Sequence, residues 1–398
     1  MSSPAHAPDA AIGAAVTLLA IASFFSGAAL RICDGLLPRL ATDFSVTAGT
    51  AGQVILAFAM AYGVSQLAYG QLGDRYGKAR VVCIALFASA AGSFACLLAP
   101  SLDALVRLRV LWGAVAGGVI PMSMAWIGDN VPWEQRQATL ARLLLGTLSG
   151  MTAGQLAGGL FADSPWGWRG AFASLCAGYL VVGTLLLARL RSIPSHPAPH
   201  PAPGNWLAPA REILRLPWAR VVMVSVLAEG VFLLGPLAYL PAYLHQRFGL
   251  TLSVASGYVA LYAIGGVVYA MLAHHIVRRF GERRMVLWGG WVVGLGFLAW
   301  YLIPYGWIAA PVALLVGFGT YLYHNTLQTH GTQMAPARRG TGMSLFAFCF
   351  FSGQAIGVAL AGRAFDRFGA APVLLVPALA LPVAGWAFAR ALKRRAAV

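Results

Sequence analysis

Ionisable side chains inside long apolar segments are the residues of this sequence best suited to chemistry. Glu229 lies near the middle of one such segment, Arg31 and Asp34 share another, and Arg109 lies in a third. A charge at the centre of a membrane helix costs at least about 2.5–3.5 kcal/mol, so these residues are expected to face a cavity or a partner. Because a desolvated carboxylate can load and release a proton, we predict Glu229 and Asp34 as proton carriers.

The two carboxylates differ in their local partners. Arg31 and Asp34 are three residues apart and share a helix face, so a local ion pair is the alternative role for Asp34. Glu229 has no basic residue three or four positions away, which favours it as the proton carrier. Arg109 could pair with either carboxylate and would be released when that carboxylate takes up a proton.

The stretch Tyr321–His330 is unusually polar for an otherwise apolar segment. Tyr321, His324 or Asn325, and Gln328 fall on one face of a helix. This face could bind a substrate or supply a titrating imidazole at His324. Hydrogen bonding that only holds helices together is the alternative. The predicted substrate contacts are Arg31, Trp112, Tyr321, His324, Asn325 and Gln328.

The composition places these residues in a membrane. Hydrophobic residues make up 59% of the 398 residues and charged residues only 10%, whereas soluble domains are roughly 45–50% apolar. The apolar segments are continuous, about 20 residues long and about twelve in number, which predicts an all-α integral membrane protein with twelve transmembrane helices. The expected spans are 13–40, 50–70, 81–99, 104–128, 138–162, 170–190, 219–243, 253–276, 285–304, 308–330, 341–363 and 371–390.

The net charge of +16 is not one basic patch, which argues against a nucleic-acid surface. Most of the 28 Lys and Arg residues lie in alternate connections and in the C-terminal tail. By the positive-inside rule, both termini are therefore expected in the cytoplasm. Met1–Ala11 lacks the basic region of a signal peptide, so we expect the first span to be retained. The five cysteines have no regular spacing and predict neither a disulfide framework nor a metal site.

The chain divides into two related halves. We predict an N-terminal six-helix bundle over 1–190, a proline-rich cytoplasmic linker over 191–218 and a C-terminal six-helix bundle over 219–398. The last part of the linker has helical amphipathic spacing and is expected to lie on the membrane surface. Paired motifs support the duplication: Gly154-Gln155 recurs as Gly353-Gln354. Two such bundles are expected to face one another across a central cavity.

The connection Gly70–Arg80 concentrates glycines and charges between two apolar segments. Its glycines permit close helix approach and a tight reversal. A connection needed only for topology would require neither these glycines nor Asp74. We therefore predict a gating motif made of Gly70, Gly73, Asp74, Arg75, Gly77, Lys78, Arg80 and Asp129.

Gly70–Arg80 resembles the signature between helices 2 and 3 of the major facilitator superfamily of secondary transporters, and the resemblance covers essentially the whole chain. The run from Leu105 to Gly113 is similar to a second family motif, whose Arg, here Arg109, is associated with proton coupling; Trp112 replaces the usual Gln. A third stretch resembles the motif of the antiporters, with Gln155 in place of Pro. It supplies a predicted helix-packing motif of Gly150, Gly154, Gln155, Gly158 and Gly159.

The resemblance also implies how the gating motif works. It places Asp74 against the N-terminus of the eleventh helix, near Gly340 and Thr341, where a helix dipole favours an anion. Arg75 is expected to reach Asp129. Both contacts would latch only a state that is open to the outside.

The sequence therefore predicts an inner-membrane transporter that exports a small organic compound, drug-like, sugar or metabolite, by proton antiport. The sequence resembles those of the drug and arabinose-type efflux permeases. The alternative is a proton-coupled symporter or a uniporter for a sugar or metabolite. No P-loop, nucleophile elbow or metal cluster occurs in the sequence, so we expect neither an enzyme nor a cofactor. The expected partners are the substrate, protons and the lipid bilayer, with no nucleic acid, and the expected state is a monomer.

Overall fold

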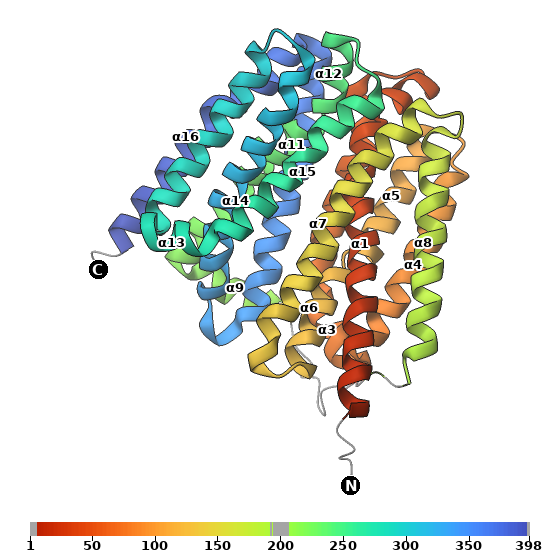
Figure 1. The fold of residues 1–398 in the computed structure, drawn as a ribbon, viewed down its shortest axis with the longest axis vertical. Coiled ribbons are helices and arrows are strands. Elements are labelled where there is room, and N and C mark those ends of the chain that lie inside the picture. Colours follow the sequence, from red (N-terminus) through yellow and green to blue (C-terminus); the bar gives the residue numbers. More distant parts are fainter. Residues whose placement is uncertain (1–5, 192, 194–206, 396–398) are drawn as a thin grey trace.

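The computed structural model describes residues 6–191, 193 and 207–395 (Figure 1). Every regular element in these ranges is a helix, so the predicted all-α fold is confirmed. Half of the predicted linker, residues 192 and 194–206, lies outside the described residues.

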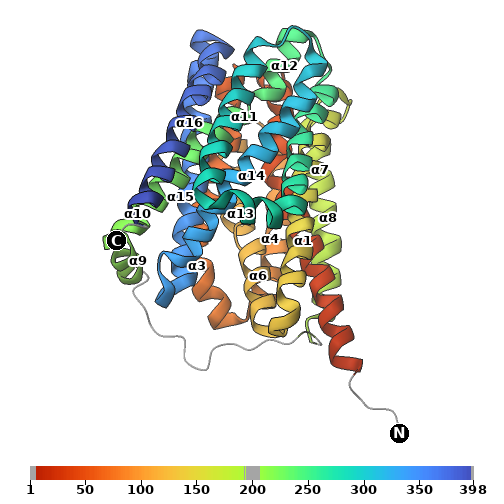
Figure 2. The same cartoon turned by 60° about the vertical axis from the view of Figure 1, so that its left-hand side comes forward.

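The N-terminal part of the chain contains eight helices among its described residues. They are α1 (His6–Asp43), α2 (Ala48–Ala51), α3 (Gln53–Tyr76), α4 (Lys78–Leu97), α5 (Leu102–Ala116), α6 (Val119–Asn130), α7 (Trp133–Asp163) and α8 (Gly167–Arg189). The short connections place consecutive long helices antiparallel to one another (Figures 1 and 2).

The C-terminal part begins with the short helix α9 (Leu207–Arg215). The elements that follow are α10 (Pro217–Glu229), a π-helical segment (Gly230–Leu234), α11 (Gly235–Leu237), α12 (Leu240–Phe248), α13 (Leu252–Leu302), α14 (Ala309–Gln333), α15 (Arg339–Phe368) and α16 (Ala370–Arg395). Two 3₁₀ turns, Gly306–Ile308 and Pro336–Arg338, precede α14 and α15.

Twelve crossings follow from these elements. Ten described helical stretches are long and apolar enough to span a membrane. The 31-residue helix α7 lies outside that set, and α13 provides two crossings. Its 51 residues would extend about 76 Å as one helix, far beyond a hydrocarbon core of about 30 Å. At Gly281 the backbone is non-helical, with φ 69° and ψ 161°, and this residue separates the two arms.

Several expected spans differ from the helices in detail. Span 104–128 is divided into α5 and α6 at a glycine pair, and span 219–243 is interrupted by the π-helical segment. Most helices run past the expected ends, as α7 does by starting at Trp133. Hydrophobicity marks only the apolar part of a helix, whereas the backbone hydrogen bonding continues into the polar interface.

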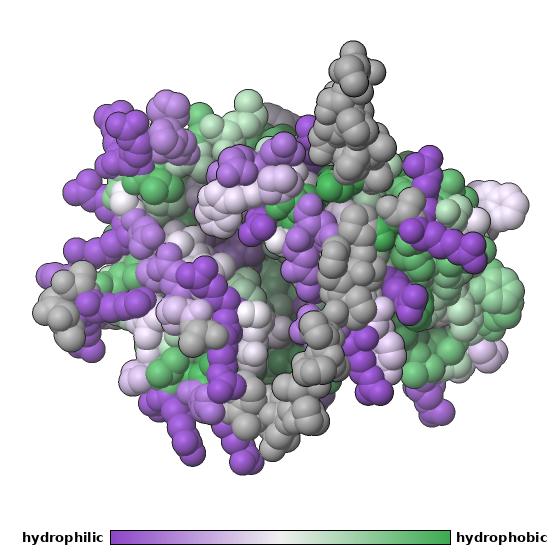
Figure 3. Space-filling view, turned by 90° about the horizontal axis from the view of Figure 1, so that it is seen from below, coloured by the Kyte–Doolittle hydropathy of each residue, from purple (hydrophilic) through white to green (hydrophobic). Residues whose placement is uncertain are grey.

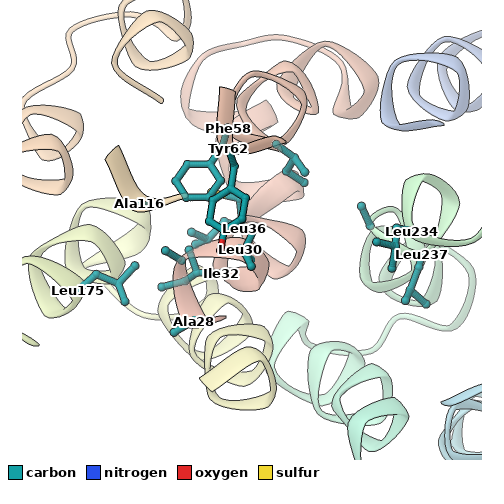
Figure 4. Close-up of a cluster of buried hydrophobic side chains, with 14 of the residues drawn as sticks. Ala28, Leu30, Ile32, Leu36, Phe58, Tyr62, Ala116, Leu175, Leu234 and Leu237 are labelled. Atoms are coloured by element: carbon teal, nitrogen blue, oxygen red, sulfur yellow. The ribbon is translucent and has the colours of Figure 1, made fainter. Parts of the chain in front are cut away.

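The two ends of the bundle differ. We call the end that carries the connections at Gly77, Val131 and Gly281 the basic end, and α9 also lies there (Figures 1 and 2). The other end carries the connections after α1, α7 and α15, together with α12. Among the buried apolar side chains, Leu30 of α1 lies near Phe58 and Tyr62 of α3 (Figure 4). Leu234 lies apart from them, on a helix of the other half (Figure 4).

A ladder of glycines on α7 brings this helix against α1. A Cβ added at Gly146, Gly150, Gly154 or Gly158 would meet the backbone carbonyl of Ala20, Phe24, Ala28 or Ile32, respectively. The spacing of four residues is the same on both helices, so α1 and α7 run parallel in continuous backbone contact.

Replacing Gly150 with Val is expected to disrupt this contact. The added side chain would occupy the space of the Phe24 carbonyl, and overpacking of this kind typically costs about 1–3 kcal/mol or more. The measurement is Tm and monodispersity in detergent. Gly128→Val is the matched control, because nothing lies within 4 Å of a Cβ added there. An equal Tm for the two variants would contradict the role of the ladder.

Candidate functional site

A cavity of about 1070 Å³ lies between the two halves of the chain. Its walls come from α1, α3 and α7 on one side and from α13, α14 and α15 on the other. Asp74, Lys78 and Thr341, which lie at the basic end, also line it. Seen from that end, hydrophilic side chains surround a recessed, more apolar area (Figure 3). The cavity therefore opens at the basic end.

Five of the six predicted substrate contacts line this cavity. They are Arg31, Tyr321, His324, Asn325 and Gln328. The amide of Asn325 donates to the hydroxyl of Tyr269 over 2.9 Å, and the ring of Tyr269 stacks on Tyr321 with 6.3 Å between centroids. The polar face of α14 predicted from the sequence is thus turned towards the cavity.

Trp112 is the exception among the predicted contacts. It is wholly buried and does not belong to the cavity wall. Its ring meets Phe58 and Phe172 edge-on, with centroids 5.5 and 5.7 Å apart. The expectation that Trp112 touches a ligand is therefore not supported in this conformation, because the face of α5 that carries it packs into the core of the N-terminal half.

Glu229 and His324 form a buried carboxylate–imidazole pair. Oε2 of Glu229 lies 2.9 Å from Nδ1 of His324, and Oε1 has no hydrogen-bond partner among the described residues. Glu229 is wholly buried and does not line the cavity, whereas His324 does. The imidazole therefore stands between the carboxylate and the cavity. Sequence reasoning singled out both residues but not their pairing, because 95 positions separate them.

Arg31 and Asp34 form the local ion pair that the sequence offered as the alternative role for Asp34. Nη2 of Arg31 lies 3.0 Å from Oδ2 of Asp34. Asp34 is wholly buried and outside the cavity wall, and Arg31 reaches the wall. The carboxylate of Asp34 is thus shielded from the cavity by its own partner.

Arg109 is almost completely buried on α5. Its guanidinium donates to the carbonyls of Val54 (3.3 Å) and Ala29 (3.4 Å) and lies 3.8 Å from the centroid of the Phe58 ring. No ion pair joins Arg109 to a carboxylate in the described part of the chain. In this conformation, backbone carbonyls and the face of an aromatic ring stabilise its positive charge.

The family model of the Major Facilitator Superfamily matches residues 19–358 of this sequence. The chain belongs to the major facilitator superfamily. This major facilitator superfamily protein is 24% identical over 351 residues to the uncharacterized MFS-type transporter YceJ of Bacillus subtilis (strain 168). The aligned region covers 87% of this chain and 89% of YceJ. It is 32% identical over 151 residues to the multidrug export protein EmrB of Haemophilus influenzae. That aligned region covers 38% of this chain and 30% of EmrB.

Solved structures show the same fold for this major facilitator superfamily protein. The D-xylose-proton symporter superposes with a TM-score of 0.76 at 16% identity, over 95% of this chain and 96% of that chain. A peptide transporter, POT, gives a TM-score of 0.79 at 16% identity, over 96% and 94% of the two chains. The chain is therefore a multi-pass membrane protein with the major facilitator fold.

Three residues of the predicted gating motif of this major facilitator superfamily protein, Gly70, Asp74 and Lys78, line the cavity. Lys78, rather than the expected Arg75, forms an ion pair with Asp129. Lys78 Nζ also lies 3.6 Å from Asp74 Oδ1. Arg75 instead lies over the ring of Tyr76. Lys78 starts α4 directly after Gly77, whose φ of 87° turns the chain back towards α6 and so brings the ammonium to Asp129.

Asp74 is half exposed and lines the same opening as Thr341 on the other half. No hydrogen bond joins Asp74 to the N-terminus of α15 among the described residues. The interhalf contact that the resemblance implies for Asp74 is thus open in this conformation.

Two other aspartates join the two halves at the opposite end. Asp163, at the end of α7, accepts hydrogen bonds from the backbone N–H of Ser253 (2.7 Å) and Leu252 (3.2 Å) and from the Ser253 hydroxyl (2.6 Å). Each donor lies in the first turn of α13, where the helix dipole favours an anion.

Asp366, at the end of α15, makes the matching contact on the other side. It accepts from the backbone N–H of Gly49 (2.9 Å) and from the Thr47 hydroxyl (2.6 Å) at the start of α2. Asp163 therefore joins the first half to the second, and Asp366 joins the second to the first. The sequence carries a signal for this pair, since Gly159-x-x-x-Asp163 recurs as Gly362-x-x-x-Asp366.

Helix α9 packs on the protein. Ile213 and Ala210 are buried in an apolar cluster with side chains of α10 and α15. Glu212 forms an ion pair with Arg338 at 3.0 Å. The position of this segment on the membrane surface stays a prediction, and the C-terminal half covers the side chains of Ala210 and Ile213.

Proposed function

We propose that this major facilitator superfamily protein is a secondary active transporter that exports a small organic compound in exchange for protons. The observation that carries the proposal is the Glu229–His324 pair, in which a wholly buried carboxylate reaches the cavity only through an imidazole. A proton can pass between cavity water and Glu229 through the two ring nitrogens of His324. Proton uptake by Glu229 and substrate binding are then linked, because both take place at the same wall of the cavity.

In this proposal the substrate enters from the cytoplasm, since the cavity opens at the basic end and basic connections favour the cytoplasmic side. The printed name of the relative EmrB, multidrug export protein, also favours outward transport. The two bundles, 1–190 and 219–398, rock about the cavity. Asp163 and Asp366 release their helix termini when the opposite end opens, and Asp74 reaches the start of α15 when the basic end closes.

The test uses proteoliposomes that contain an internal pH dye, to which neutral, cationic and anionic organic compounds are added across an imposed pH gradient. Substrate-dependent proton movement opposite to substrate flux would support antiport. Proton movement in the same direction as the substrate would favour the symporter, and flux without proton movement the uniporter.

Replacing Asp74 with Asn is expected to reduce transport several-fold and to leave membrane insertion intact. The variant removes the charge that would bind the N-terminus of α15, a contribution of roughly 0.3–1 kcal/mol when exposed. Substrate flux and membrane protein level are the two measurements. Asp103→Asn is the control, since Asp103 lies at the opposite end, in the first turn of α5. Wild-type flux in the Asp74 variant would contradict the latch.

A further inference from the structure

Three glutamine side chains line the cavity and are themselves almost completely buried. Gln66 on α3, Gln155 on α7 and Gln354 on α15 are 7, 3 and 3% exposed. None of them makes a hydrogen bond within the described part of the chain, and both amide atoms of Gln155 are buried without a partner. Buried amides of folded proteins are normally hydrogen-bonded, so this arrangement points to a ligand that supplies the missing partners.

Gln155 and Gln354 occupy matching positions in the two halves. Each follows a glycine that presses its helix onto a neighbour: a Cβ at Gly154 would meet the carbonyl of Ala28, and one at Gly353 the carbonyl of Leu227. The glycine contacts fix the rotation of α7 and α15. The two amides are thereby held in the cavity wall from opposite halves of the protein.

The ionisable side chains along the cavity already have partners within the protein. Arg31 is paired with Asp34 at 3.0 Å, and His324 with Glu229 at 2.9 Å. Asp74 is the one carboxylate among the described residues that line the cavity, and it lies at the mouth beside Lys78. A cationic ligand would therefore meet no free carboxylate inside, and an anionic ligand would compete with Asp34. Either charge would lose its hydration without a free counter-charge.

Ring surfaces lie beside the amides. Tyr62 of the first half and Phe351 of the second approach each other with 4.7 Å between centroids, and both line the cavity. Tyr321 and Tyr269 add a stacked pair on the other wall. An apolar ring of a ligand can pack on these faces while its polar groups reach the glutamines.

We propose that the cavity selects an uncharged ligand that combines several hydroxyl or amide groups with one apolar ring, and that Gln155 and Gln354 recognise its polar groups. This inference rests on the proposed function for the identity of the site. An amide offers both a donor and an acceptor, and so does a hydroxyl, so neutral groups of this kind satisfy both ends of each glutamine.

The test is calorimetric binding to the purified full-length protein, with no proton gradient, of three matched probes: phenyl glucoside (neutral), phenyl glucosaminide (cationic) and phenyl glucuronide (anionic). The neutral probe is expected to bind about tenfold more tightly than either charged one. Tetraphenylphosphonium serves as the lipophilic cation. Equal or tighter binding of any charged probe, or no binding of the glucoside at its solubility limit, would overturn the inference.

Side-chain variants complete the test. Gln155→Leu and Gln354→Leu are each expected to weaken glucoside binding about two- to tenfold. Gln53→Leu, an exposed position at the other end of α3, is the matched control. Gln354→Glu is expected to shift the preference to the glucosaminide, a change that misfolding cannot produce. Unaltered binding in all three cavity variants would exclude the glutamines as the recognition groups.

The two proposals fail separately. Glucoside binding without proton movement in proteoliposomes would refute antiport and leave the ligand class standing. Proton movement driven by a lipophilic cation, with no glucoside binding, would refute the ligand class and leave antiport standing.

Discussion

Replacing Glu229 with Gln is expected to abolish substrate-driven proton movement while substrate exchange continues. Gln preserves the shape of the side chain and a hydrogen-bonding group 2.9 Å from His324, but it cannot take up a proton. Because His324 keeps a hydrogen-bond partner and can be neutral, the variant need leave no charge alone in the interior, and the folded yield is expected to hold. Proton movement should fall to the level of protein-free vesicles.

Two measurements separate coupling from folding in this variant. The internal pH dye reports proton movement, and counterflow of labelled substrate at equal pH reports exchange. Glu134→Gln is the matched control, an exposed carboxylate in the first turn of α7. Normal proton movement in the Glu229 variant, combined with its loss in Asp34→Asn, would transfer the role to Asp34.

Replacing both Asp163 and Asp366 with Asn is expected to open the end of the molecule opposite to the cavity mouth. Each carboxylate accepts charge-assisted hydrogen bonds from a helix start in the other half. Loss of each charge should cost the closed state about 1 kcal/mol or more. Each single variant then shifts the equilibrium about fivefold, and the double variant about 25-fold if the two sites are independent.

Spin labels on Trp166→Cys and Phe368→Cys report this opening, because both residues are exposed at the affected end and lie in different halves. The double variant should add a longer distance to the distribution seen for the parent protein. Asp43→Asn is the control at the same end, since among the described residues Asp43 pairs only with Arg39 of its own helix. An unchanged distribution in the double variant would mean that apolar packing alone keeps this end closed.

The fold was predictable because it depends on patterns within each segment. Continuous apolar runs predicted the crossings, and the glycines of 150–159 predicted close helix contact. The interruption of α10 by a π-helical segment was not predicted, although a local sign follows the segment: Pro236 has no N–H to bond the Phe232 carbonyl as a regular helix requires. The separation of α13 at Gly281 matches the expected gap between two spans, since glycine alone adopts its positive φ without strain.

The site was predictable only where one helix contains it. The polar face of α14 follows from spacing, and so does the Arg31–Asp34 pair. The Glu229–His324 pair joins two helices whose relative rotation no local pattern encodes. The same limit explains Trp112: its neighbourhood in the sequence resembled a functional motif, but the rotation of α5 turned its ring into the core.

The π-helical segment makes the position of Glu229 depend on one surplus residue. Across Gly230–Leu234 the chain uses a bond from the Gly235 N–H to the Gly230 carbonyl, one residue wider than an α-helical bond. Deleting a residue there would turn everything before it by about 100° relative to α11 and α12. Glu229 would then point away from His324 although every side chain of the pair was still present. The number of residues in Gly230–Leu234, as well as their identity, therefore determines whether Glu229 can reach His324.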